Sequence, residues 1–230
     1  IISGIGFLML AGILSTAAAF TLWGIFPLYL KLLKGVPSLE ILSHRVIWSI
    51  LLVLVILGVR KQWSWLTKIA ERPRIALVFA ASATMLATNW VVYIWAVGEQ
   101  RIIDASLGYF ITPLFNILFG IMLGERLRNV QWLAIAFAAS GVMWLTLSVG
   151  QLPWIGLTLA VTFSLYGLLR KTAPLGPLEG LAVETLVMLP LAVLFLILPE
   201  SGSSHSFIAG DPVLSGLLFA AGPVTAIPLL

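Results

Sequence analysis

The chain has 230 residues, of which 60% are hydrophobic and 10% are charged, and it contains no cysteine. Soluble domains carry about 25% charged residues, so this chain has too few charges to cover a soluble surface. The lack of cysteine excludes disulfide scaffolds, thiolate metal sites and cysteine nucleophiles. We therefore expect an all-α membrane protein that crosses the bilayer several times.

Eight apolar segments of 17–25 residues follow one another along the chain, and this is the length of a membrane-spanning helix. None shows the alternating pattern of a barrel strand. In chain order they are Gly6–Leu30, Ile41–Val59, Ile75–Val97, Ala105–Leu123, Trp132–Ser148, Leu152–Leu169, Leu181–Leu198 and Val213–Leu230. Because the chain lacks a starting methionine and ends within an apolar segment, we expect it to be a fragment of a longer protein.

Lysine and arginine residues between the spans predict the orientation. The loops after even-numbered spans carry nine of them, and the loops after odd-numbered spans carry three. Cytoplasmic loops are enriched in these residues, so we expect the even loops and the N-terminus to be cytoplasmic. The net charge of +4 then reflects topology, and we expect no nucleic-acid partner.

Two passages of the chain are similar to each other. Phe20–Gly24 in the first span resembles Phe163–Gly167 in the sixth, and each is followed by a basic residue, a proline and a glutamate. A repeat of five spans has an odd number of crossings, so its two copies have opposite orientations, as in many secondary transporters. This predicts a first repeat over residues 1–148 and a truncated second repeat over residues 152–230, with about eight of ten helices present.

Several motifs resemble a known family. The passage Asp104–Leu127, which contains Ser-Leu-Gly-Tyr-Phe and Leu-Gly-Glu-Arg-Leu, resembles the EamA repeat of the drug/metabolite transporter superfamily. Ile41–Ser49, Asn89-Trp90 and Ile94–Val97 are similar to RarD-type permeases. The resemblance implies a five-plus-five helix carrier of the bacterial inner membrane with both termini in the cytoplasm. It does not supply a substrate.

Charged side chains lie near the outer end of the second span. Glu40 and His44 share a helix face because they are four residues apart, Arg45 lies beside them, and Asp104 begins the fourth span at the same level. A charge inside the bilayer costs about 2.5–3.5 kcal/mol, which favours a cavity or a partner. Two interpretations stay open for this expected network. It forms an outer gate or a site for an anionic group, or its side chains reach the headgroups and anchor the helix.

Glu184 lies about one turn inside the inner end of the seventh span. A carboxylate that is removed from water can take up and release a proton, which makes Glu184 a candidate for coupling transport to a proton gradient. A hydrogen bond to Thr185 or to a neighbouring helix is the structural alternative. An inverted repeat puts Glu184 and Arg45 at opposite mouths.

The fourth span carries small or polar residues at every fourth position. The row consists of Asp104, Gly108, Thr112, Asn116, Gly120 and Gly124. Its glycines predict close helix packing, and Gly120 with Gly124 forms a dimer-type pattern, so a homodimer is one expected assembly. The candidates for lining a substrate path are Asn89, Tyr109, Thr112 and Asn116. For the two asparagines, hydrogen bonding between helices is the alternative.

Motifs for nucleotide or enzyme chemistry are absent from the sequence. It contains no phosphate-binding Gly-x-x-x-x-Gly-Lys-Ser/Thr loop, no His-Glu-x-x-His and no Gly-x-Ser-x-Gly. We therefore expect a secondary transporter of small metabolites or drugs, not an enzyme, with no cofactor and no metal; proton coupling is left open. The alternative is a non-transporting membrane partner or receptor.

Overall fold

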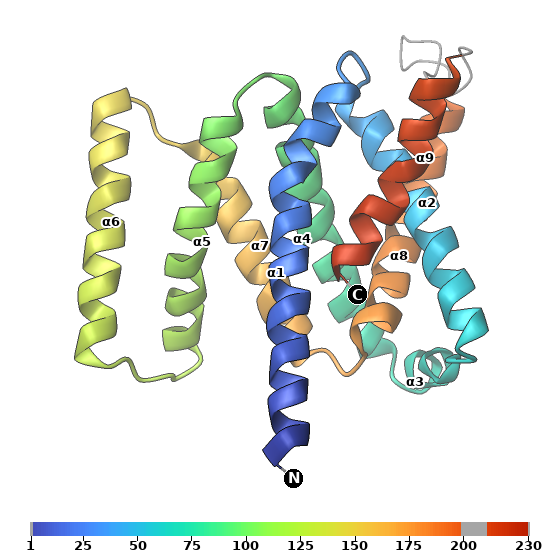
Figure 1. Ribbon diagram of the computed structural model, residues 1–230, viewed down its shortest axis with the longest axis horizontal. Helices are drawn as coiled ribbons and strands as arrows, with labels where there is room; N and C mark the ends of the chain where they lie inside the picture. The colour runs from blue at the N-terminus through green and yellow to red at the C-terminus, as the bar shows by residue number, and fades with distance from the viewer. Residues whose placement is uncertain (1, 199–210, 230) are drawn as a thin grey trace. The chain divides into compact units, whose positions relative to one another are not determined.

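The computed structural model describes residues 2–198 and 211–229, and within these ranges it contains helices and no strand (Figure 1). The α-helices are α1 (Ile2–Leu32), α2 (Ser38–Val59), α3 (Ser64–Glu71), α4 (Pro73–Gly98), α5 (Ile102–Met122), α6 (Asn129–Val149), α7 (Trp154–Thr172), α8 (Pro177–Ile197) and α9 (Pro212–Ala226). A 3₁₀ turn, η2 (Ile227–Leu229), follows α9. Ser204 and His205 lie outside the described residues.

A helix overlaps each of the eight predicted spans. Among the described residues, six helices are long and apolar enough to cross a membrane, namely α1, α2, α4, α5, α6 and α8. The shorter α9 has 15 residues, and α7 ends in the charged pair Arg170 and Lys171. The chain is thus an all-helical membrane protein with several crossings, which confirms the predicted fold class.

Local sequence sets the limits of several helices. Proline occupies the first position of α4, α8 and α9, where its fixed φ suits a helix and its missing N–H is not needed. Asp211 caps α9, because its carboxylate accepts a hydrogen bond from the Val213 amide at 2.8 Å. Gly150 ends α6 in the left-handed region, with φ of +70°.

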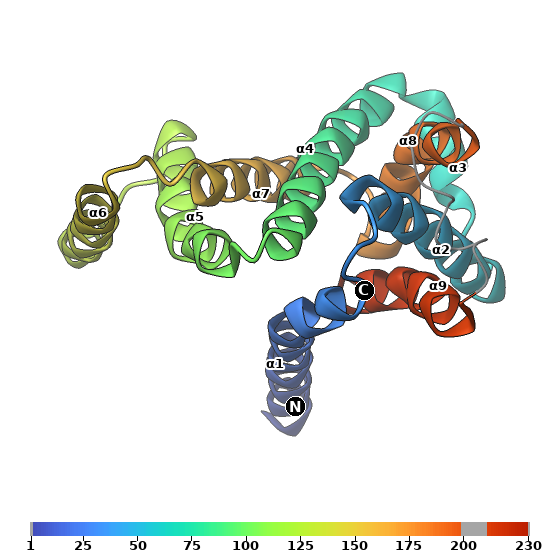
Figure 2. The same cartoon turned by 90° about the horizontal axis from the view of Figure 1, so that it is seen from above.

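The chain folds into two compact units. One unit combines residues 1–71 with residues 175–230, and the other covers Arg72–Pro174. We call them unit 1 and unit 2. In unit 1, α2 packs against both α8 and α9 (Figure 1). In unit 2, α7 lies between α4 and α5, and α6 stands apart next to α5 (Figure 2). The predicted repeats, residues 1–148 and 152–230, divide the chain differently and stay a prediction.

Candidate functional site

A group of polar side chains is buried on α2 in unit 1. Glu40, His44, Arg45 and Ser49 are all buried, although α2 is otherwise strongly apolar. Because α2 packs against α8 and α9, these side chains are enclosed by protein. Buried charges in a membrane helix normally mark a functional pathway or a structural network, so this group is the first candidate site.

Arg45 is held by side chains from two other helices. Its side chain is only 4% exposed, its Nε donates a hydrogen bond to Thr225 Oγ1 of α9 at 2.8 Å, and its guanidinium lies 4.8 Å from the ring centre of Phe26 of α1. Thr225 in turn donates to the Ala221 carbonyl at 2.7 Å. These partners hold the Arg45 side chain within unit 1, and its role as a gate or binding residue stays a prediction.

Close packing at the crossing of α2 and α9 fixes the position of Thr225. Gly222 lies against α2 so closely that an added Cβ would be 2.4 Å from the Trp48 carbonyl carbon. Ser49 Oγ donates to the Gly222 carbonyl at 3.2 Å, and the rings of Trp48 and Phe219 are 4.7 Å apart. A small residue at this crossing lets the backbones approach and brings Thr225 within reach of Arg45.

Glu184 of α8 is also completely buried in unit 1. The neighbouring Thr185 donates its hydroxyl to the Leu181 carbonyl of its own helix at 2.7 Å. The hydroxyl of Thr185 therefore donates within α8. The two interpretations of Glu184, a proton-coupling group or a structural group hydrogen-bonded to Thr185 or to a neighbouring helix, both stay predictions.

Arg45 and Glu184 approach the interior of unit 1 from opposite ends. A hollow of about 330 Å³ is lined by Ile56, Arg60 and Gln62 at the end of α2 and by Gly176, Pro177, Leu178 and Glu179 at the start of α8. The two helices are therefore antiparallel neighbours. Each charge is the eighth residue of its helix, so each lies about 10 Å from its own helix start.

In unit 2, Asn89 joins two helices. Its Nδ2 donates hydrogen bonds to the Leu159 carbonyl and to Thr162 Oγ1 of α7, both at 3.0 Å. This geometry matches the interhelical alternative for Asn89. By contrast, Asn116 of α5 is exposed, and within the described part of the chain its side chain makes no hydrogen bond. The two asparagines therefore have different surroundings.

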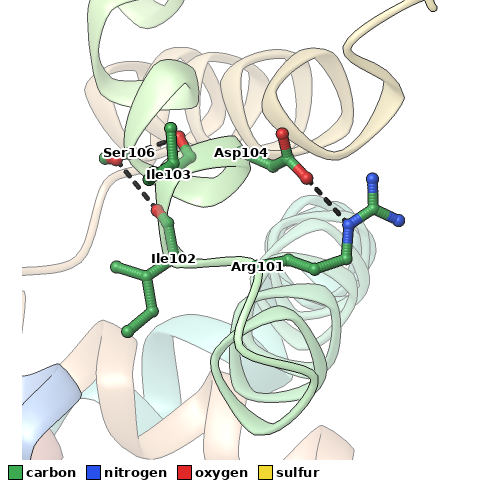
Figure 3. A network of polar contacts seen from close by, with 5 residues as sticks. All are labelled: Arg101, Ile102, Ile103, Asp104 and Ser106. Carbon is green, nitrogen blue, oxygen red and sulfur yellow. Dashed lines mark hydrogen bonds and ion pairs between the residues drawn. The ribbon is translucent and has the colours of Figure 1, made fainter.

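Asp104 forms an ion pair at the start of its own helix. Its Oδ2 lies 2.7 Å from Nε of Arg101, three residues earlier (Figure 3). Asp104 belongs to unit 2, whereas Glu40, His44 and Arg45 belong to unit 1, so the expected four-residue network stays a prediction. The partner Arg101 was missed, although a spacing of three on one helix end signals such a pair.

The remaining candidates lie further along α5. Thr112 donates to the Gly108 carbonyl at 2.7 Å, and its own carbonyl, next to Pro113, accepts a hydrogen bond from Ser164 of α7 at 3.2 Å. This hydrogen bond ties α5 to α7 beside the mid-helix Pro113. Tyr109 is exposed, and its ring contacts that of Tyr93 edge-on, with ring centres 6.5 Å apart.

The glycines of α5 serve different purposes. Gly108 packs tightly on α7, where an added Cβ would be 3.0 Å from the Gly156 carbonyl oxygen, so close packing is confirmed at this position. Gly124, however, lies beyond the last residue of α5 and has φ of +88°. It therefore ends the helix and does not extend a dimer-type face with Gly120. No group of three His, Asp or Glu side chains comes close enough to hold a metal ion among the described residues.

Comparison with known proteins gives a consistent family assignment. Residues 10–147 match the EamA-like transporter family. The chain is 44% identical over 222 residues to the protein RarD of Escherichia coli, which spans 95% of this chain and 74% of that protein. It is 43% identical over 213 residues to an uncharacterized transporter of Pseudomonas aeruginosa, covering 92% of this chain and 72% of that one.

A relative with lower identity carries a more specific name. The chloramphenicol-sensitive protein RarD of Pseudomonas aeruginosa is 35% identical over 191 residues, which is 79% of this chain and 62% of that protein. No solved structure matches the chain.

Proposed function

Because the chain belongs to the EamA-like transporter family, we propose that it acts as a secondary transporter for a small metabolite or drug in the bacterial inner membrane. The proposed orientation has a cytoplasmic N-terminus, from the distribution of lysine and arginine. The observation that carries the proposal is a pair of opposite charges, Arg45 and Glu184, buried on the neighbouring helices α2 and α8.

Burial gives each charge a distinct role in this proposal. Arg45 is the site for an anionic group of the substrate or of a gate, because a guanidinium binds carboxylate and phosphate groups through a planar set of donors. The Thr225 hydroxyl and the Phe26 ring occupy part of the guanidinium surface in this structure. A substrate anion that reaches Arg45 would compete with the Thr225 hydrogen bond, which links the α2–α9 contact to binding.

Glu184 is the proposed proton-coupling group. It lies on α8, about 10 Å from the helix start, and the hollow beside that start is lined by Glu179, five residues earlier. Opening at this end would bring water to Glu184, and closure would exclude it. Alternating access of a carboxyl group in this way is a general route to proton-coupled transport.

Asn116, Tyr109 and Thr112 are proposed to line the substrate path in unit 2.

The test of transport begins with the full-length protein in a ligand-dependent thermal stabilisation screen. Compounds that stabilise the protein are then radiolabelled and offered to proteoliposomes with and without a pH gradient. A secondary transporter accumulates the compound only while the gradient persists, and a proton ionophore abolishes the accumulation. A receptor or a non-transporting partner would bind the same compound without any flux above that of protein-free liposomes.

A further inference from the structure

The helix α3 was not expected from the sequence, and the proposed transport mechanism does not use it. It has eight residues and lies between the membrane-length helices α2 and α4. Four residues, Arg60–Trp63, connect it to α2, and Arg72 alone connects it to α4. Four residues reach at most about 14 Å, so the chain itself keeps α3 at the end of the two spans, in the headgroup region of a bilayer.

The faces of α3 differ sharply in character. Trp65 is buried, with 3% of its surface exposed, whereas Leu66 is 49% exposed. On the helix, Leu66 lies about 100° from Trp65, and the exposed Lys68 lies about 60° from Trp65 on its other side. An apolar and a cationic side chain that flank a buried tryptophan suit a helix in the membrane interface, where the leucine reaches the acyl region and the ammonium reaches the headgroups.

The residues before α3 continue the same surface. Trp63 is 42% exposed, and its ring lies over the end of α2, where an added Cβ on Gly58 would be 3.8 Å away. Arg60 and Lys61 are exposed beside it. Tryptophan is enriched at the headgroup level of membranes, and lysine and arginine there are attracted to anionic lipids. Three cations, one indole and one leucine thus form a surface of mixed character; the acids beside it are Glu71 at the end of α3 and Glu179, which lines the same hollow as Arg60.

We propose that Arg60, Lys61, Trp63, Leu66 and Lys68 form a binding surface for anionic phospholipid headgroups. We call these five residues the α3 surface. Its cations bind the phosphate groups, and its two apolar side chains insert among the upper acyl carbons. Because its cations attract negative charge, the α3 surface should bind anionic lipids in preference to zwitterionic lipids. If the cations served only to set the orientation of the chain in the membrane, no such preference would be expected. Arg60 also lines the hollow beside Glu179, whereas the other four residues of the surface do not.

The test uses the full-length protein with Leu66→Cys, which is the single attachment site within residues 1–230, because these contain no cysteine; any cysteine outside them is first replaced by serine. A fluorophore at this position is quenched in liposomes that contain either brominated phosphatidylglycerol or brominated phosphatidylcholine, at the same total lipid composition. Each surface cation contributes about fivefold to anionic-lipid attraction, so we expect the phosphatidylglycerol quencher to be at least about fivefold more effective. Added salt should lower this preference.

Variants separate lipid binding from general charge. Lys61→Gln with Lys68→Gln should lower the ratio of the two quenching effects severalfold, because Arg60 is then the one cation left on the α3 surface, and Lys61→Arg with Lys68→Arg should keep the parental ratio. The matched control, Lys31→Gln with Lys34→Gln, removes two exposed cations elsewhere in unit 1 and should leave the ratio unchanged. Equal quenching by both lipids in the parent protein, quenching by neither, or an undiminished preference in Lys61→Gln/Lys68→Gln overturns the proposal.

Discussion

Arg45 contacts Thr225 through Nε and Phe26 through the face of its guanidinium. Both contacts depend on the planar shape of the group. A lysine ammonium carries the same charge, but it has no fixed donor at the Nε position and no flat surface to place over a ring. At this position, geometry as well as charge therefore determines what the side chain can bind.

Arg45→Lys in the full-length protein should lower transport at least about tenfold, because a hydrogen bond to a charged group contributes about 1.5–3 kcal/mol. Initial uptake rates in proteoliposomes, normalised to monodisperse protein, measure this effect. Arg74→Lys on α4 is the matched control, since Arg74 is exposed and lies outside the proposed site, and it should transport normally. Normal uptake by Arg45→Lys would remove Arg45 from the site.

Substitution of Asn89 should mainly lower stability, whereas substitution of Asn116 should mainly lower transport. Asn89→Leu removes the hydrogen bonds to Leu159 and Thr162, and we expect the melting temperature to fall, with a loss of about 0.6–1.7 kcal/mol in stability. Asn116→Leu removes no hydrogen bond among the described residues, so stability should be kept while uptake falls. Thermal unfolding and uptake on the same preparations check both. A stable Asn89→Leu, or a fully active Asn116→Leu, contradicts this assignment.

At the scale of elements, the crossing of α2 and α9 depends on the missing side chain of Gly222. Its ideal Cβ position is 2.4 Å from the Trp48 backbone and 2.7 Å from the Ser49 amide nitrogen. These neighbours are backbone atoms of another helix, so they cannot turn aside as a side chain can. The crossing also sets the register that brings Thr225 to Arg45.

Gly222→Ala should therefore force α9 away from α2 and destabilise the protein by about 1–3 kcal/mol. Gly216→Ala on the same helix is the control, because nothing lies within 4 Å of its Cβ position. That substitution should be neutral or stabilise slightly, since alanine favours helix over glycine by up to about 1 kcal/mol. Equal melting temperatures for the two variants would show that the crossing is not tight.

The sequence predicts the long apolar helices well and the short amphipathic one not at all. Each span was predicted from an unbroken apolar run, which the bilayer requires whatever the tertiary contacts. The helix α3 was missed because its eight residues mix charges with tryptophan and leucine, and so read as a loop. The partners of Arg45 were missed for another reason. Phe26 and Thr225 lie 19 and 180 residues away, and no local spacing connects them.

At the scale of the whole molecule, the two compact units do not coincide with the predicted repeats. Unit 1 takes sequence from both ends of the chain, because α2 packs on α8 and α9. Periodicity and charge bias describe each span and its direction, but not which spans pack together. Those contacts depend on small residues such as Gly108, Gly156 and Gly222, whose partners only the folded chain reveals.

Topology can be tested directly, because residues 1–230 contain no cysteine. Lys68→Cys and Ser204→Cys place single thiols in the loops after the second and the seventh span. The excess of nine basic residues over three predicts that position 68 faces the cytoplasm and position 204 the outside. An impermeant thiol reagent on intact cells should label position 204 and spare position 68. Labelling in the opposite pattern would reverse the orientation.

The central claim is gradient-driven transport that depends on the buried charge of unit 1, and Glu184→Gln tests it most directly. Glutamine keeps the size and hydrogen-bonding capacity of the side chain but cannot bind and release a proton. The matched control is Glu179→Gln on the same helix, where Glu179 caps the Gly176 amide at 3.1 Å and glutamine can cap equally well.

The measurement compares two modes of transport in the same proteoliposomes of the full-length protein. One is accumulation of a stabilising compound under an imposed pH gradient, and the other is exchange of that compound across the membrane without a gradient. We predict that Glu184→Gln loses accumulation and retains exchange, while Glu179→Gln retains both. Accumulation by Glu184→Gln at the parental level, with the parental pH dependence, would contradict the account and place the coupling proton elsewhere.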